Sequence, residues 1–279
     1  MGKPYHLQLL ILKWKKEKII KLKYHDLISR NPIIFKDVGS IKCPKLSEVD
    51  NITFEVYYSF LSSLIITPED YFENLEKKYN VKIPLEAVIE TTKFDLVLTD
   101  DRIMKNIVEA LNFFLVENVK FNIKDERFEI YICSEDNSEK IVGYITKEIY
   151  NEVIDVILQR VGVNIKNDSI DLSKVKNKRG LKIFKKIMEE RKKFKKAKQT
   201  SEKSNEQSLP NIISSIAAYS PNTNYVNVWD LTVYEAQDLF NRLTVIDQYN
   251  INSTSTSVWG DEKKQFKIGA WHTCLYEDK

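Results

Sequence analysis

The chain has 279 residues, of which 43% are apolar, and its 43 Lys and Arg against 40 Asp and Glu give a formal net charge of +3. It contains only seven glycines, no two closer than nine positions apart, so it holds neither a G-x-G-x-x-G dinucleotide fingerprint nor a G-x-x-x-x-G-K-[ST] phosphate loop. Its three histidines and three cysteines form no H-E-x-x-H or C-x-x-C pattern. The composition excludes these nucleotide and zinc motifs and favours a binding, scaffolding or assembly role.

The sequence also indicates a cellular compartment. Three widely spaced cysteines are typical of a reducing compartment rather than of a disulfide framework. The longest apolar stretches fall far short of the roughly 20 residues of a membrane span, and lysines interrupt the N-terminal apolar run from Lys13 onward. We therefore expect a cytoplasmic protein with no membrane span and no signal peptide.

Residues 1–173 mix strand-like alternation with helical periodicity, which predicts an α+β domain with hairpins and several helices. Two hairpins are predicted, from residues 7–14 with 19–24 and from residues 121–123 with 128–132; a single basic helix is the alternative for the first. Residues 52–58 fit either a strand or the start of a helix. Three further helices are predicted from their opening residues: 71–79 after Thr67 and Pro68, 103–111 after Asp100 and Asp101, and 146–161 from Thr146.

A strongly basic segment follows this domain. Lys174 to Lys198 holds thirteen Lys or Arg against two Glu, a local charge of +11, so the rest of the chain carries −8. Helical spacing of apolar residues from Leu181 to Phe194 predicts an amphipathic basic helix over 181–198, and residues 199–208 form a polar linker. The candidate basic patch consists of Lys182, Lys185, Lys186, Lys192, Lys193, Lys195 and Lys196. Burial of its aromatic residues against the domain is favoured, and nucleic-acid binding is the alternative.

Residues 208–279 form a third part, after the basic helix and linker over 174–207. Leu209 and Pro210 begin a predicted helix, and a second helix starts at Thr232, where Glu235 completes a capping box. This small, mainly helical unit cannot bury much surface alone, so it needs the main domain or a partner. Because Trp and Tyr concentrate interface energy, we predict partner contact through Trp229, Tyr234, Phe240, Trp259 and Trp271. For Trp229 and Phe240 a place in the unit's own core is at least as well supported.

No arrangement of residues predicts catalysis. The adjacent acidic pairs at Glu69 and at Asp100 lie where helix N-termini favour negative charge, so capping explains them. Cys133 has no neighbouring histidine to activate it, and the segment around His272 and Cys274 is better explained as an aromatic terminal segment that packs onto the body. We predict a protein that is not an enzyme, with no catalytic residues, no metal site and no cofactor.

The C-terminal sequence resembles a known group of proteins. The runs SLPNIISSIAAYSPNTNYVNVWDLTVYEAQDLFNRL, DQYNINSTSTSVWG and WHTCLYED are similar to the C-terminal region of tailed-bacteriophage proteins of Gram-positive hosts, and ALNFFLVENVKF and ITKEIYNEVIDVILQ are also phage-like. The resemblance covers roughly residues 100–279. It implies a protein of a phage tail module, either a tail assembly chaperone or a minor tail component, and it brings no catalytic residues.

These observations give a functional expectation. The favoured interpretation is a non-enzymatic phage tail assembly protein that acts in the host cytoplasm as a chaperone, holding the tape-measure protein during tail morphogenesis, with a tape-measure or tube protein as partner. A structural tail or baseplate component retained in the virion is the alternative, and an accessory nucleic-acid binder that uses the basic patch is the second alternative. The sequence leaves the oligomeric state open.

Overall fold

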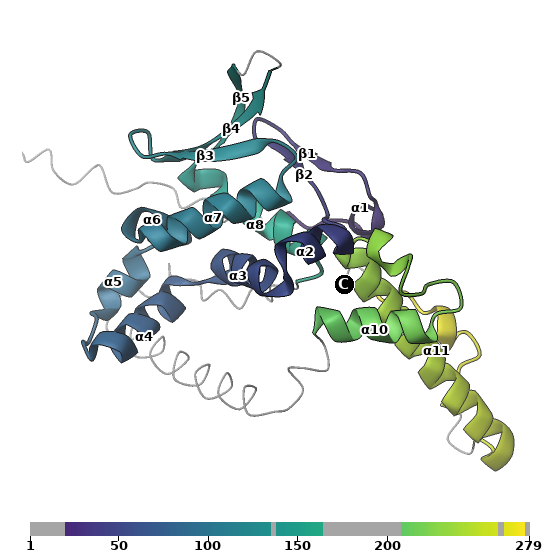
Figure 1. Ribbon diagram of the computed structural model, residues 1–279. Coiled ribbons are helices and arrows are strands. Elements are labelled where there is room, and N and C mark those ends of the chain that lie inside the picture. Colours follow the sequence, from purple (N-terminus) through teal and green to yellow (C-terminus); the bar gives the residue numbers. More distant parts are fainter. Residues whose placement is uncertain (1–19, 135–137, 164–207, 262–264, 277–279) are drawn as a thin grey trace, which may run out of the picture.

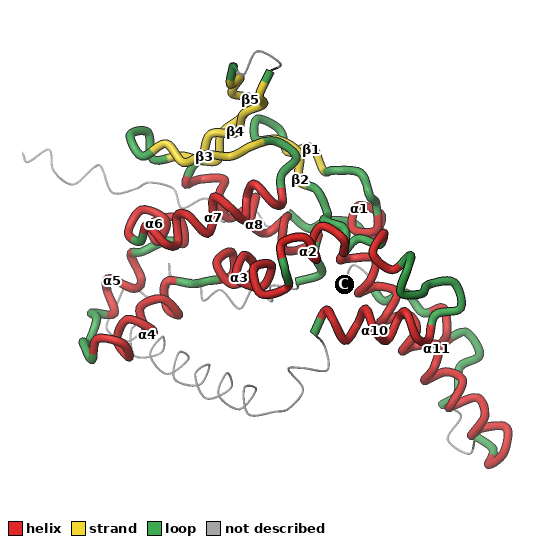
Figure 2. Tube along the Cα trace, viewed as in Figure 1, coloured by secondary structure: helices red, strands yellow, loops and turns green. Residues whose placement is uncertain are grey.

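The computed structural model describes residues 20–134, 138–163, 208–261 and 265–276, and it has a mixed α+β fold. Figures 1 and 2 show a three-stranded sheet above two helices, with further helices on either side of this centre. One long helix, α11, extends away from the body. The chain therefore combines a packed body with an elongated helical projection.

The helices make up most of the described structure. In chain order they are α1 (Tyr24–Ile28), α2 (Leu46–Ile52), α3 (Phe54–Ile65), α4 (Pro68–Tyr79), α5 (Leu85–Glu90), α6 (Lys93–Thr99), α7 (Asp101–Phe114), α8 (Lys147–Arg160), α10 (Leu209–Tyr219) and α11 (Val233–Trp259). Two short 3-10 helices, η3 (Val228–Asp230) and η4 (Ala270–His272), precede and follow α11.

The main sheet is an antiparallel meander. Its strands β3 (Asn118–Asn122), β4 (Arg127–Cys133) and β5 (Glu139–Ile145) lie in the order β3-β4-β5. Phe128 of β4 is fully buried and stacks on Tyr150 of α8, with 6.0 Å between the ring centroids. On α7, the Asn112 side chain accepts a hydrogen bond from the Val119 N–H and donates to the Val119 carbonyl, so a helix residue pairs with the outer edge of β3. The sheet is thus fixed on one face and at one edge by helices.

A second, two-stranded sheet lies against β5, the outer strand of the first sheet. It consists of β1 (Ile33–Phe35) and β2 (Gly39–Ile41), and its connecting turn reaches β5, where the Tyr144 N–H donates to the Asp37 carbonyl at 3.1 Å. A Cβ on Gly143 would lie 2.2 Å from the Val38 carbonyl oxygen. This glycine is required because the backbone of the turn approaches β5 too closely for any side chain.

A single hydrophobic core joins the body to the C-terminal helices. It contains Phe128 and Ile157 from the body, together with Ile216 of α10 and Val233 of α11. The helices that follow residue 207 therefore complete the same core that the sheet and α7 begin, and the C-terminal unit docks on the body.

Several predicted elements are confirmed. Thr67 caps α4 by accepting from the Asp70 N–H, with Pro68 in the first turn, and Asp100 caps α7 by accepting from the Arg102 N–H. The second predicted hairpin is β3 with β4, and residues 52–58 contain the end of α2 and the start of α3, separated by Thr53. The helix after Thr146 and the two C-terminal helices are also present, although the Thr146 side chain makes no capping hydrogen bond.

The second strand of the first predicted hairpin is wrong. Residues 20–23 have no regular secondary structure, and Tyr24 begins α1. The backbone at Ile20 and Leu22 bonds to the Gln159 amide of α8 instead of to a strand, and both side chains pack against the core. The alternation here therefore marks a segment that packs on a helix rather than a strand. The other predicted strand, residues 7–14, lies outside the described residues.

Candidate interaction surface

The start of α11 is bonded to the start of α2. The Leu46 N–H donates to the Leu231 carbonyl at 2.8 Å, and the Val233 N–H donates to the Pro44 carbonyl at 2.9 Å. Between them, Thr232 and Glu235 form the predicted capping box, in which the Thr232 hydroxyl accepts from the Glu235 N–H. Residues 44–46 and 231–233 thus form a short two-stranded contact that fixes the direction in which α11 leaves the body.

A group of tyrosines holds the next turn of α11. We call Tyr24, Tyr234, Asp238 and Tyr276 the tyrosine clasp. The Tyr24 hydroxyl donates to the Asp238 carboxylate at 3.1 Å, and the Tyr24 and Tyr276 rings stack with 4.7 Å between centroids. Burial, followed by the hydrogen bond to Asp238, raises the pKa of Tyr276 to about 12. The clasp therefore joins α1, α11 and the C-terminal segment through neutral phenols around one carboxylate.

A buried arginine fixes α1 for this contact. The Arg160 side chain is fully buried, and its guanidinium donates to the backbone carbonyls of Asp26, Ser29 and Asn31, at 2.8 Å for Ser29 and 3.1 Å for Asn31. These carbonyls lie at the C-terminal end of α1 and just beyond it, where a helix leaves acceptors unpaired. Arg160 thereby holds α1 against α8 and presents Tyr24 to α11.

Three of the five predicted partner residues lie inward. Tyr234 is only 4% exposed, in the clasp. Trp229 and Phe240 are half-buried and pack against the core. For Trp229 and Phe240 the sequence left open a place in the C-terminal unit's own core, and the structure packs both against a core that this unit shares with the body.

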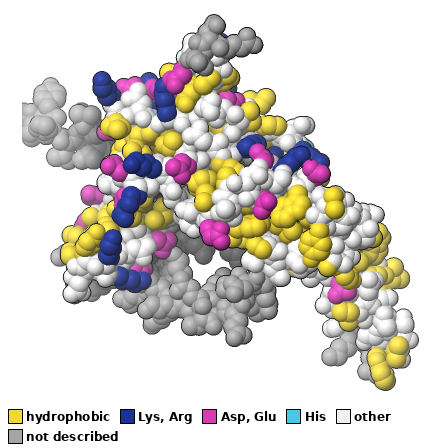
Figure 3. All heavy atoms as spheres, viewed as in Figure 1, with side chains coloured by type: hydrophobic (Ala, Val, Ile, Leu, Met, Phe, Trp, Pro, Cys, Tyr) yellow, Lys and Arg dark blue, Asp and Glu magenta, His cyan; other side chains and the backbone are white. Residues whose placement is uncertain are grey.

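The other two predicted residues lie on a projection of the molecule. We call residues 265–273 the returning segment, and we call residues 244–259 of α11 together with the returning segment the arm. Figure 3 shows apolar side chains on its surface, including its far end. Trp259 is 81% exposed and Trp271 is 47% exposed. Three aliphatic residues of the arm are also exposed: Ile251 (57%), Val258 (64%) and Ile268 (78%). The arm thus presents large apolar side chains to solvent along its whole length.

The returning segment covers one side of the arm helix. Gly260 has a positive φ of 79°, which allows the chain to reverse, and the Asp261 carboxylate accepts from the backbone N–H groups of Gln265 and Phe266 at 2.9 Å each. The Phe266 ring packs on Tyr249 with 5.5 Å between centroids. Further along, the Arg242 guanidinium donates to the Thr273 carbonyl at 2.8 Å. The segment therefore runs back along α11 towards the clasp.

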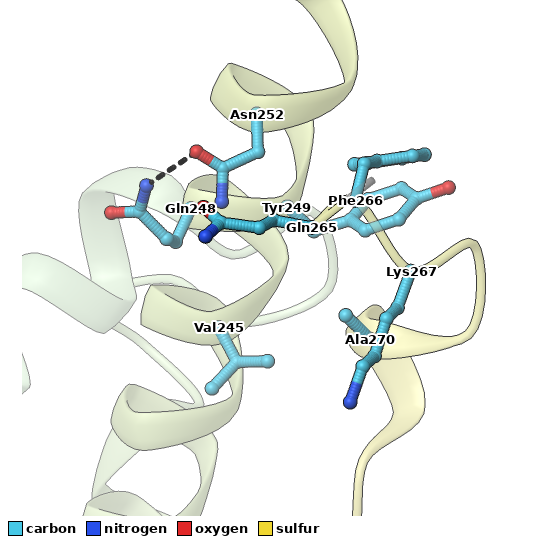
Figure 4. A pocket seen from close by; sticks show the side chains of 8 residues that line it. All are labelled: Val245, Gln248, Tyr249, Asn252, Gln265, Phe266, Lys267 and Ala270. Carbon is cyan, nitrogen blue, oxygen red and sulfur yellow. Dashed lines mark hydrogen bonds between the residues drawn. The ribbon is translucent and has the colours of Figure 1, made fainter. Parts of the chain in front are cut away.

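A small pocket of about 220 Å³ lies between α11 and the returning segment (Figure 4). Four lining residues come from α11 and four from the returning segment: Val245, Gln248, Tyr249, Asn252, Gln265, Phe266, Lys267 and Ala270. The Gln248 amide donates to the Asn252 side-chain carbonyl at 3.0 Å, so two of its polar groups pair with each other. The pocket is therefore a gap in the packing between α11 and the returning segment.

The described residues contain no group of three or more His, Cys, Asp or Glu that could hold a metal ion. Cys43 is buried and its thiol donates to the Arg160 carbonyl at 2.9 Å; burial raises the pKa of this thiol, which disfavours the reactive thiolate. The His272 ring packs against Trp271, with 4.8 Å between centroids. Among the described helices, none has both the length and the apolar character to cross a membrane. The candidate basic patch, Lys182 to Lys196, lies outside the described residues.

The family model of the YomV second domain matches residues 196–276, which include α10, η3, α11 and the returning segment. YomV is a protein of a Bacillus phage region, so the C-terminal part of this chain is similar to phage-associated sequence. No curated protein and no solved structure matches the chain. The matched range begins before α10 and ends at Tyr276 of the clasp, so it contains the arm and the C-terminal side of its attachment.

The sequence analysis missed the aliphatic residues of the arm. Ile251 and Val258 lie among Ser, Thr and Asn, so no apolar run marks them. The available signal was their spacing: both continue the i, i+3, i+4 pattern of Ala236, Phe240 and Leu243 beyond the point at which we ended the predicted stripe.

Proposed function

We propose that this protein is a non-enzymatic, phage-associated assembly protein that holds an apolar partner on its arm. The observation that carries the proposal is the exposure of Trp259, Ile268 and Trp271 on a projection that leaves the body. Several large apolar side chains exposed on one projection favour a site of protein interaction. The similarity of residues 196–276 to the YomV second domain supports a phage context for it.

The chemistry of the arm favours an apolar rather than a charged partner. From residue 248 to residue 260 the sequence contains no charged side chain. Its exposed polar groups are hydroxyls and amides, and several hydroxyls, such as those of Thr254 and Ser257, already bond to the helix backbone. Binding there would remove apolar surface from water without separating or burying charges, which suits transient contact with an extended, partly apolar chain.

Within this role we propose the more specific function of tail assembly chaperone, with the tape-measure or tube protein as partner. The arm suits that task because a rigid body with a projecting apolar surface can keep a long chain soluble until subunits polymerise around it. Mass spectrometry of purified virions tests this point: a chaperone is absent from the finished particle, whereas a stoichiometric amount in the particle would replace the chaperone by a structural tail component.

The arm itself is tested by substitution. We expect the double variant Trp259→Ala/Trp271→Ala to retain less than about a tenth of the wild-type capture of co-expressed tape-measure protein, because exposed tryptophans at interfaces commonly account for 2 kcal/mol or more of binding. Ile34→Ala is the matched control, since Ile34 is an exposed apolar residue on β1 of the body. Equal capture by the double variant and the control would remove the arm from the proposed function.

A further inference from the structure

The returning segment is attached to α11 by side chains alone. Its backbone N–H groups donate to carbonyls within the segment or to the Asp261 carboxylate. The Arg242 guanidinium of α11 donates to the Thr273 carbonyl, which is a bond from a side chain to the backbone. In the part of the chain that the structure describes, no backbone hydrogen bond joins the segment to α11. The segment can therefore leave the helix without breaking any backbone pairing between the two.

The packing between the segment and α11 is also incomplete. None of residues 265–273 is buried, and Ile268 and Trp271 are 78% and 47% exposed. The segment packs on α11 through the Phe266 ring, whose centroid lies 5.5 Å from that of Tyr249. Beside this ring pair lies the gap of about 220 Å³, several times the ~30 Å³ that one water molecule occupies in the liquid. Few buried contacts and few shared hydrogen bonds are typical of a segment that opens locally.

Both ends of the segment are held, and the chain between them has slack. Asp261 caps the start of the segment, and Tyr276, just beyond its end, stacks on Tyr24 in the clasp. Along α11, the path from Asp238 of the clasp to Asp261 is about 35 Å at 1.5 Å per residue. The 15 residues after Asp261, up to Tyr276, reach about 50 Å when extended. The segment is thus long enough to lift off the helix while both of its ends stay attached.

The segment covers a side of α11 that carries apolar residues. Val245 and Tyr249, four positions apart on this side, both line the gap. Figure 4 shows Val245 on the helix, across the gap from Ala270 of the returning segment. Val245 and Tyr249 are half-buried, whereas Val258, farther along the arm, is exposed. Removal of the cover would add these two side chains to the apolar surface that the arm exposes.

We propose that the returning segment is a detachable cover for this side of α11. It lifts off as one unit, with Asp261 and Tyr276 as its fixed ends, and uncovers Val245 and Tyr249 while the base of the helix stays folded. The arm therefore has a closed form and an open form, and the open form offers more apolar surface to a partner. This opening goes beyond the proposed function and does not depend on it, because it is a property of the chain alone.

The labelling rate of an engineered thiol measures the opening. In a Cys133→Ser/Cys274→Ser background, which removes the two exposed thiols, Val245→Cys reports the open form and the buried Cys43 reports global unfolding. We expect a maleimide to modify Val245→Cys at least about 100-fold faster than Cys43, because the body stays folded when the segment opens. Between 0 and 1 M urea the first rate should rise less than about twofold and the second at least about fivefold, since urea sensitivity follows the surface exposed. Equal rates, or equal urea sensitivities, would overturn the proposal.

A substitution in the segment separates opening from permanent exposure of Val245. Phe266→Ala removes the ring that packs on Tyr249 and should raise the Val245→Cys rate at least about fivefold, with the Cys43 rate unchanged. Ile268→Ala is the matched control, because this side chain of the same segment already faces solvent. The thiol of Val258→Cys gives the rate at an uncovered position of the arm. If Val245→Cys reacts as fast as Val258→Cys and Phe266→Ala changes nothing, the segment is not a cover.

A second substitution separates opening of the segment from unfolding of the arm helix. Ser255→Ala/Ser257→Ala raises the helix propensity at two exposed positions of α11. It should leave the Val245→Cys rate unchanged, whereas fraying of the helix as the route of exposure predicts a rate about fivefold slower, which would overturn the proposal. Labelling needs no partner, so failure of the capture experiment removes the proposed function and leaves this inference intact, and the reverse also holds.

Discussion

The two halves of α11 have the same backbone conformation but are stabilised in different ways. Residues 233–243 are held by the body: Val233 and Ala236 are fully buried, and the clasp fixes Tyr234 and Asp238. Residues 244–259 contact the returning segment, and Asp247 accepts a hydrogen bond from the Tyr219 hydroxyl of α10 at 3.0 Å, but most of their other side chains are exposed. One continuous helix therefore passes from a structural element of the core to a surface element.

The sequence of the second half is a poor helix former. Asn250, Asn252 and the run from Ser253 to Ser257 each cost about 0.5 kcal/mol relative to Ala in a helix interior, or on the order of 3–4 kcal/mol together. The hydroxyls of Thr244, Thr254 and Ser257 bond back to the carbonyl four residues earlier, which competes with regular helix geometry. The arm thus depends on its attachment to the body. The sequence of the arm therefore favours recognition over helix stability.

The largest expected difference in stability is between an Ile→Ala substitution in the body and one in the arm. Ile216→Ala in α10 removes a fully buried side chain of the common core and should lower the free energy of unfolding by about 2–5 kcal/mol. Ile251→Ala in the arm removes an exposed side chain and should change it by less than about 0.5 kcal/mol at low protein concentration. Urea denaturation at ~2 µM measures both. A similar loss in the two variants would mean that the arm is part of the cooperative core.

Hydrogen exchange sharpens the comparison without substitution. Amides of residues 236–243 should be protected close to the level of the global core, whereas amides of residues 250–258 should exchange at least about 100-fold faster, because the arm can open while the body stays folded. Uniform protection along α11 would contradict the division into two halves.

The helix caps, which depend on local chemistry, were predicted from the sequence. The caps at Thr67, Asp100 and Thr232 could be identified because each uses a short side chain and its own next turn. The contacts that position the arm could not, because they join residues far apart in the chain. Nothing near Arg160 in the sequence shows that its guanidinium is buried against the carbonyls after α1, or that Tyr24 meets Asp238 across 214 positions.

The candidate surface was predicted only in part for a related reason. Residue type correctly directed attention to tryptophans, but residue type does not say which side of a helix is covered. Trp229 packs on the core and Trp259 does not, although both follow aliphatic residues, because α10 and the body end before the second. Strand β5 was missed because Gly143 interrupts its pattern, and that glycine exists only for the turn of another sheet.

The smallest expected effect concerns the tyrosine clasp, which holds the first half of α11. Because the folded-state pKa of Tyr276 is raised to about 12, above the ordinary value near 10 of an unfolded tyrosine, its contribution to stability is complete below pH 10 and is lost as the pH rises from about 10 to 12. Tyr276→Phe keeps the ring that stacks on Tyr24 and removes the hydroxyl. Since Tyr276 is only partly buried, we expect a loss of at most about 1 kcal/mol at pH 8, which shrinks above pH 10 as the wild-type phenol ionises. Urea denaturation of both proteins between pH 8 and pH 11 measures this difference, and Tyr225→Phe, at an exposed tyrosine outside the clasp, is the control. A difference that stays constant or grows with pH would show that the hydroxyl of Tyr276 does not hold the base of the arm in its neutral form.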